Sequence, residues 1–207
     1  VLLVDVGDFL QGDNAAYYYN FVDTTSRHIF ARMAEYMDYD AVIVGNHDVE
    51  TGHAAYDRLR AQLDMPFLAA NAIRTDNGEA YFQEYTIVRR HGLKIAIVGF
   101  TNPGIPGWLS PELWSGMEFR ELLPYAQEVV DRVAAKENPD NDVAVQVLMN
   151  LRGMIDDAQV DEIISNMPAE MLENEKVAYL KKGLDARKAT AEGKMYTDFT
   201  VEHVYGY

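Results

Sequence analysis

The 207-residue sequence contains no cysteine. This absence excludes disulfides, thiolate metal sites and cysteine nucleophiles within the chain, but it says little about the cellular compartment. Basic residues are also scarce: there are 18 Lys and Arg against 33 Asp and Glu, which gives a net charge of -15. A chain this acidic repels phosphate backbones and anionic lipid surfaces. We therefore expect no nucleic-acid polymer among its partners.

No apolar run approaches the roughly 20 residues of a membrane-spanning helix, so we expect no membrane span. Three motifs are also missing, namely a Gly-rich phosphate loop, a Gly-x-Ser-x-Gly elbow and a dinucleotide fingerprint. What is present is an ordinary globular composition, 48% hydrophobic and 25% charged, enough for one large domain or two small ones. The chain opens on Val1 without an initiator Met, so we expect a fragment with residues upstream.

Short apolar runs in the first 140 residues predict buried strands. They cover residues 1–6, 41–44 and 67–70, and a hairpin is expected between 85–89 and 93–100, with its second arm central in a sheet. Helical patterns separate the first three runs. We therefore expect an α/β fold with a parallel or mixed sheet.

Helices are predicted from caps and apolar spacing. One is expected to begin at the N-cap candidates 24–26, a second to run over 54–63 with Thr51 as its cap, and a third to cover 121–136. The side chains predicted to face the core from the first helix are Ile29, Met33, Tyr36 and Met37.

Residues 101–116 form a long irregular segment that holds three prolines and both tryptophans, Trp108 and Trp114. Segments of this kind often carry function. The two tryptophans are equally compatible with stacking on a base and with anchoring the segment. We expect Trp108 to lie at the entrance of a site and to contact substrate.

The composition changes after residue 140, where methionine becomes common and proline rare. Residues 143–148 read as a strand, and 158–166 and 171–188 read as helices. We expect one domain over 1–148, and a helical tail with an extended terminal piece over 149–207.

Polar residues follow two of the predicted strands. Gly7 and Asp8 end the first, and Gly45-Asn46-His47-Asp48 ends the second. Loops beyond the carboxyl ends of parallel strands converge on a ligand crevice. A carboxylate and an amide oxygen suit divalent cations, and His47 is placed to donate a proton. Gly-Asp alone is common turn chemistry, but the pairing of the two motifs is much rarer.

Residues 2–12 and 42–48 resemble two signature blocks of the calcineurin-like metallophosphoesterases. Gln11-Gly12 and the stretch 105–116 are similar in particular to the branch of 5'-nucleotidases and 2',3'-cyclic-nucleotide phosphodiesterases. The resemblance covers about residues 1–140. It implies a partial α/β/β/α sandwich, followed here by a mostly helical C-terminal segment.

The same resemblance implies the chemistry. Two divalent ions (Mn, Fe, Zn or Mg) would be bridged by Asp8, with Asn46 on one of them. His47 with Glu50 would be the acid that stabilises the transition state, although the family usually has Asp at the position of Glu50. The substrate would be a nucleotide or similar small phosphoester, and the location exported, periplasmic or at the cell surface.

Two departures from the family leave alternatives open. The Asp-x-His block and the Gly-His-x-His block are missing, and Asp8 and Asn46 alone cannot saturate two cations that each take about 5–6 donors. We therefore expect a domain that is incomplete at both ends and inactive as it stands. The alternatives are a non-catalytic binding or assembly module, or part of a thioredoxin-like redox protein, which residues 188–201 resemble weakly. A join between two contexts near 138–150, or an insertion, would explain the change of composition.

Overall fold

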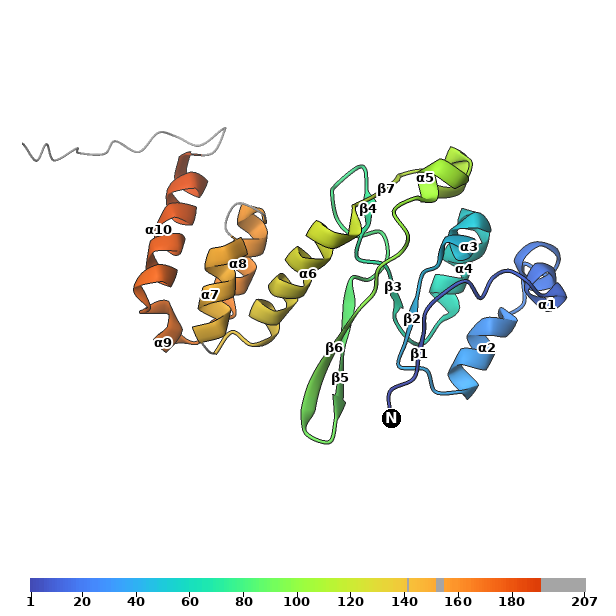
Figure 1. Ribbon diagram of the computed structural model, residues 1–207, viewed down its shortest axis with the longest axis horizontal. Helices are drawn as coiled ribbons and strands as arrows, with labels where there is room; N and C mark the ends of the chain where they lie inside the picture. The colour runs from blue at the N-terminus through green and yellow to red at the C-terminus, as the bar shows by residue number, and fades with distance from the viewer. Residues whose placement is uncertain (141, 152–154, 191–207) are drawn as a thin grey trace, which may run out of the picture. The chain divides into compact units, whose positions relative to one another are not determined.

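The computed structural model describes residues 1–140, 142–151 and 155–190 (Figure 1). The chain divides into two compact units, Val1–Val129 and the part from Val130 onward. The structure thus groups residues 130–148 with the second unit. The domain boundary expected at residue 148 stays a prediction.

A three-stranded parallel sheet lies at the centre of the first unit. Its strands are β1 (Val4–Asp5), β2 (Ala41–Ile43) and β3 (Phe67–Leu68), in the order β1-β2-β3. The three apolar runs predicted as strands are therefore confirmed. Because the strands are parallel, β1 and β2 end at the same edge of the sheet, and the two glycine-containing motifs follow at that edge.

Helices connect these strands, and α2, α3 and α4 lie on one side of them in Figure 1. The helical segments of the first unit are α1 (Asn14–Tyr17), the π-helical η1 (Tyr18–Val22), α2 (Ile29–Tyr36), α3 (Asn46–Glu50), α4 (His53–Gln62), α5 (Ile105–Trp108) and the 3-10 turn η2 (Pro111–Trp114). α6 (Leu122–Glu137) crosses the boundary between the units. The sequence analysis missed α1 and η1.

Two antiparallel pairs complete the first unit. β5 (Tyr85–Arg90) and β6 (Leu93–Val98) form the predicted hairpin, and both turn residues, His91 and Gly92, have the positive φ of a type I′ turn. β4 (Ala72–Arg74) pairs with β7 (Met117–Phe119). The central position expected for β6 is wrong, because β6 pairs with β5 alone among the described strands. None of the residues of β6 is buried, as in a two-stranded ribbon.

The predicted core face of α2 is also wrong. Ala31 and Ala34 are fully buried, whereas Met33 and Met37 are about half exposed and Tyr36 is 91% exposed. Small side chains let α2 approach its neighbours closely, so the alanine side of the helix faces the core. The N-cap is His28, whose Nδ1 accepts a hydrogen bond from the backbone N–H of Phe30, rather than a residue in 24–26.

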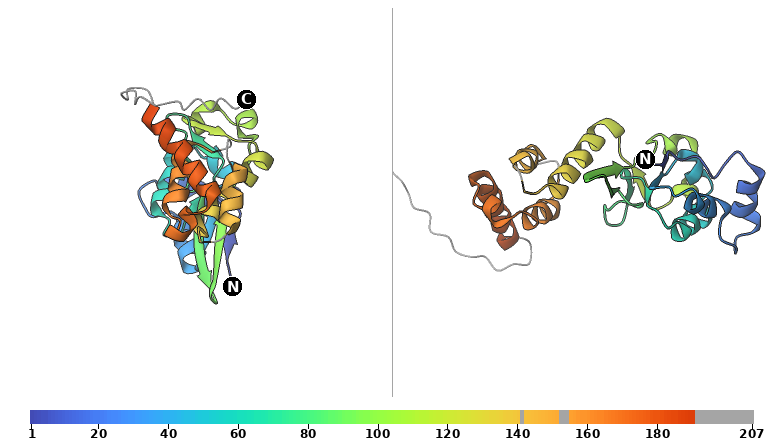
Figure 2. Two further views of the ribbon diagram at one scale, coloured as in Figure 1. Left: turned by 90° about the vertical axis from the view of Figure 1, so that its left-hand side faces the viewer. Right: turned by 90° about the horizontal axis from the view of Figure 1, so that it is seen from below.

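The second unit is helical throughout its described part. It contains α7 (Asp142–Leu151), α8 (Asp157–Ser165), α9 (Ala169–Leu172) and α10 (Glu175–Thr190). α10 lies alongside α7 and α8, as the views in Figure 2 also show. The strand expected over 143–148 is wrong: these residues belong to α7, and Ala144, Val145 and Leu148 are buried in one cluster with residues of α8 and α10.

Most of the stretch that resembles a thioredoxin-like domain, residues 191–201, lies outside the described part of the chain. In the part that the structure describes, none of the helices combines the length and the apolar character needed to cross a bilayer.

Candidate active site

The two strand-end loops approach each other very closely. A Cβ added at Gly7 would lie 2.5 Å from the backbone nitrogen of Gly45, and one added at Gly45 would lie 2.1 Å from Asp8 Oδ1. Gly7 also has a φ of 96°, which a residue with a side chain rarely adopts. Both positions therefore require glycine: Gly7 for the turn and the contact, and Gly45 for the contact alone.

A buried carboxylate holds the two loops together. Asp48, which is fully buried, accepts hydrogen bonds at Oδ2 from the N–H groups of Asp8 (2.9 Å) and Gly45 (2.8 Å). Its Oδ1 accepts a third, from Leu10 N–H at 3.0 Å. Burial raises the pKa of Asp48 to about 7, although these three donors favour the carboxylate. The sequence analysis noticed Asp48 only as part of a motif and missed this role.

Asp8 lies against the first turn of α3. Its φ is 65°, in the left-handed region, and its Oδ1 accepts a hydrogen bond from the backbone N–H of His47 at 2.9 Å. α3 begins at Asn46, so the structure brings the two predicted metal ligands to neighbouring loops. Asp8 is exposed and Asn46 is half-buried. Their roles as ligands remain predictions.

His47 and Glu50 form an ion-pair geometry on α3. The distance from His47 Nδ1 to Glu50 Oε2 is 2.7 Å, and the same carboxylate oxygen accepts a hydrogen bond from Gln11 Nε2 at 3.0 Å. The Nε2 of His47 makes no hydrogen bond to another residue in the described ranges. Glu50 therefore contacts one ring nitrogen, as expected, and the other is available. Thr51, expected to cap the next helix, instead donates its hydroxyl to the carbonyl of Asp48 at 2.7 Å.

A cavity of about 270 Å³ opens beside His47 and Glu50. The residues that line it come from the loop after β1, from α1 and η1, and from α3. They are Leu10, Gln11, Gly12, Asp13, Tyr17, Asn20, Phe21, His47, Glu50 and Thr51. His47 thus lies at the wall of a concave site, and no residue of 101–116 belongs to that wall.

The described residues do not complete a binuclear metal centre. Within 1–140, 142–151 and 155–190, no group of three or more His, Asp or Glu side chains is arranged to hold a metal ion. Asp8 and Asn46 supply hard oxygen donors, but two ions need about 5–6 donors each. These residues alone therefore do not fit the two ions that the family resemblance implies.

The two tryptophans of the segment 101–116 differ. Trp114 is partly buried, donates its Nε1–H to the carbonyl of Leu109 at 3.2 Å and packs edge-on against Phe119. Trp108, at the end of α5, is 61% exposed. Trp114 therefore anchors the segment, and the substrate role of Trp108 stays a prediction.

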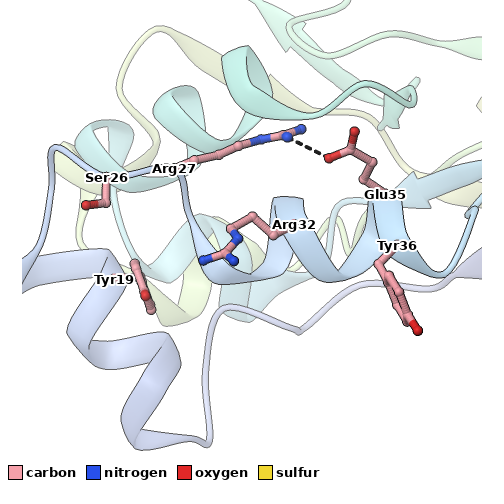
Figure 3. Close-up of a pocket in the computed structure, with 6 residues that line it drawn as sticks. All are labelled: Tyr19, Ser26, Arg27, Arg32, Glu35 and Tyr36. Carbon is pink, nitrogen blue, oxygen red and sulfur yellow. Dashed lines mark hydrogen bonds and ion pairs between the residues drawn. The ribbon is translucent and has the colours of Figure 1, made fainter.

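A second, larger hollow of about 670 Å³ lies beside α2 and shares no residue with the cavity at His47 (Figure 3). Two arginines, Arg27 and Arg32, line it, and Arg27 forms ion pairs with Glu35 (2.6 Å) and Asp64 (2.8 Å).

Comparisons with known proteins point to one family, although no protein-family model matches the chain. The chain is 31% identical over 107 residues to a 5'-nucleotidase of Vibrio cholerae, an alignment that spans 52% of this chain and 19% of that protein. It is 26% identical over 150 residues to the trifunctional nucleotide phosphoesterase protein YfkN of Bacillus subtilis, covering 65% of this chain and 10% of YfkN.

The structural comparison agrees. A crystal structure of calcineurin-like phosphoesterase YfkN from Bacillus subtilis matches with a TM-score of 0.56 and 25% identity, covering 65% of this chain and 45% of that one. The chain spans about a fifth or less of the length of the two curated relatives named above. These matches do not support a non-catalytic module or a redox protein. The chain therefore contains a segment that is similar to part of the calcineurin-like metallophosphoesterases of the 5'-nucleotidase type.

Proposed function

We propose that this chain forms part of the active site of a hydrolase that acts on nucleotides or similar small phosphoesters. The observation that carries the proposal is the pair of His47 and Glu50, 2.7 Å apart, on a helix whose first turn contacts Asp8. Relatives named as a 5'-nucleotidase and a nucleotide phosphoesterase support the substrate class.

In this proposal His47 is the general acid. Glu50 accepts a hydrogen bond from the Nδ1–H of the imidazolium, and the same carboxylate accepts one from Gln11 Nε2–H. The free Nε2–H then donates its proton to the oxygen of the departing alcohol as the P–O bond breaks. A positioned acid of this kind contributes about 10²–10⁴ in rate.

We further propose that Asp8 and Asn46 are ligands of divalent ions. Bound ions would polarise the phosphoryl oxygens and activate a water. Because Asp8 and Asn46 do not complete such a centre, the steps assigned above involve only His47, Glu50 and Gln11. An exported location is proposed on the family likeness alone.

The test compares two matched histidine variants, both in the chain and in the whole reading frame that encodes it. His47→Asn should lower kcat for AMP hydrolysis by about 10²–10⁴ while leaving metal uptake, measured by calorimetry, within error. His91→Asn, in the exposed hairpin turn where asparagine tolerates the positive φ, should change neither. Asp8→Ala should reduce both activity and metal uptake.

Unchanged hydrolysis in His47→Asn, in a protein that binds metal and turns over AMP, would remove His47 from the mechanism. Failure of both the chain and the whole reading frame to hydrolyse any phosphoester would overturn the proposed function itself.

A further inference from the structure

The cavity beside His47 has two exposed aromatic walls. Tyr17 and Phe21 are 62% and 50% exposed, and their ring centroids are 5.2 Å apart. Exposed aromatic pairs that face a concave site offer stacking surfaces to a flat ligand. Phe21 belongs to the π-helical turn η1, and π-helical turns are rare and occur frequently at functional sites.

Hydrogen bonds hold one residue of the cavity lining, Asn20, in place. Asn20, which is buried, donates its Nδ2–H to the carbonyl of Leu10 at 2.7 Å, and its Oδ1 lies 3.0 Å from His28 Nε2. These hydrogen bonds fix Asn20, which lies next to Phe21 in the sequence, to Leu10 of the strand-end loop and to His28. A preformed site loses little conformational entropy when a ligand enters it.

The charge of the lining is negative on balance, because two carboxylates stand against His47, the one side chain of the lining that is cationic when its imidazole is protonated. Two carboxylates, Asp13 and Glu50, belong to it, and none of its residues is Lys or Arg. An anionic group in this cavity would be repelled, whereas a neutral or cationic group would not. The volume of about 270 Å³ is slightly below the roughly 300–1,000 Å³ of sites that enclose a whole ligand, so the cavity suits one part of a substrate.

We propose that this cavity binds the alcohol part of the phosphoester and selects a planar, aromatic alcohol that is uncharged or cationic. The inference rests on the proposed function, because the departing oxygen must lie at His47 Nε2. The ring of the alcohol then stacks against Tyr17 and Phe21, and Asp13 disfavours a second anionic group.

The test uses three matched alcohols and does not require catalysis. Binding of benzyl alcohol, 4-(aminomethyl)benzyl alcohol and 4-(hydroxymethyl)benzoate to the chain is measured by amide chemical shifts. The shifts should cluster in residues 10–22 and 47–51. We expect the cationic alcohol to bind about three- to fivefold more tightly than the anionic one.

Two variants separate stacking from charge. The double variant Tyr17→Leu and Phe21→Leu should lower the affinity for all three alcohols by about two- to tenfold. Tyr36→Leu, which changes an exposed aromatic residue outside the cavity, should leave all three affinities unchanged. Asp13→Asn keeps the N-cap of α1, since asparagine caps as well as aspartate. This variant should reduce the difference in affinity between the cationic and the anionic alcohol.

The inference would be overturned by saturable shifts elsewhere on the molecule, by tighter binding of the anionic alcohol, or by unchanged affinity in the double variant. An active whole protein that depends on His47 but not on Tyr17 and Phe21 would also overturn it and leave the proposed function standing. Conversely, binding at residues 10–22 in a protein without any hydrolytic activity would support the cavity assignment while removing the proposed function.

Discussion

At the scale of single residues, Asp48 is the group whose loss should damage the site most. Asp48→Asn replaces one carboxylate oxygen by an NH₂ group that faces backbone N–H donors. We expect the free energy of unfolding to fall by about 1–3 kcal/mol, because the NH₂ group of the asparagine and a backbone N–H group, both hydrogen-bond donors, are left facing each other in the interior. Urea denaturation measures this. Asp38→Asn, at an exposed position with positive φ, is the control and should stay within about 0.5 kcal/mol.

His28 should make the stability depend on pH. Burial, with a smaller effect from the positive Arg58, lowers the pKa of His28 from its ordinary 6.5 to about 4. Between these values the unfolded chain binds more protons than the folded one, so this contribution to stability is complete above pH 6.5 and is lost as the pH falls toward 4. The slope reaches at most about 1.4 kcal/mol per pH unit. Denaturation from pH 4 to 7 should show a shallower slope in His28→Asn; equal slopes would contradict the assignment.

The residue scale also shows how far sequence reasoning reached. That Asp8 and Asn46 lie close together could be predicted because each directly follows a glycine at the end of an apolar run, and His47 is the residue after Asn46. The hydrogen bonds that Asp48 accepts could not be predicted, because two of its three donors lie in a loop about 40 residues away and only the pairing of β1 with β2 brings them together. His28 caps α2 and is buried.

At the scale of elements, the segment 101–116 allows the two tryptophans to be compared directly. Trp114→Ala should cost about 1–3 kcal/mol, because it removes the contact with Phe119 and the hydrogen bond to Leu109. Trp108→Ala should change stability by less than about 0.5 kcal/mol and leave metal uptake intact, because the side chain is exposed. A large loss of stability from Trp108→Ala would show that Trp108 anchors the core. It would contradict the prediction that Trp108 lies at the entrance of a site.

Element types were predicted better than their faces and ends. The strands 41–44 and 67–70 and the hairpin at His91-Gly92 follow from local patterns, and all are present. The prediction of the buried face of α2 was wrong because the spacing of Met33 and Tyr36 marks one side of a helix. It does not say whether that side or the alanine side is covered. The prediction of a strand over residues 143–148 was wrong because a short apolar run fits a strand and a buried helix equally.

At the scale of the whole molecule, the two units have separate buried cores without a shared residue. Leu148→Ala should lower the stability of the second unit by about 2–5 kcal/mol, since Leu148 is fully buried there. Amide exchange should show the loss in α7, α8 and α10 and leave residues 41–49 protected. Gln146→Ala, exposed on the same helix, is the matched control. Equal loss of protection in both units would show that the chain unfolds as one.

The contact between Asp8 and His47 also bears on how the chain folds. The two residues are 39 positions apart, and their loops meet only where two parallel strands lie side by side. Closing such a long stretch costs entropy before any contact is gained, so non-local pairings of this kind form slowly. The candidate active site should therefore arise late in folding, in the same step as the pairing of β1 with β2. Refolding followed by stopped-flow should accordingly recover helical signal before it recovers ligand binding at His47.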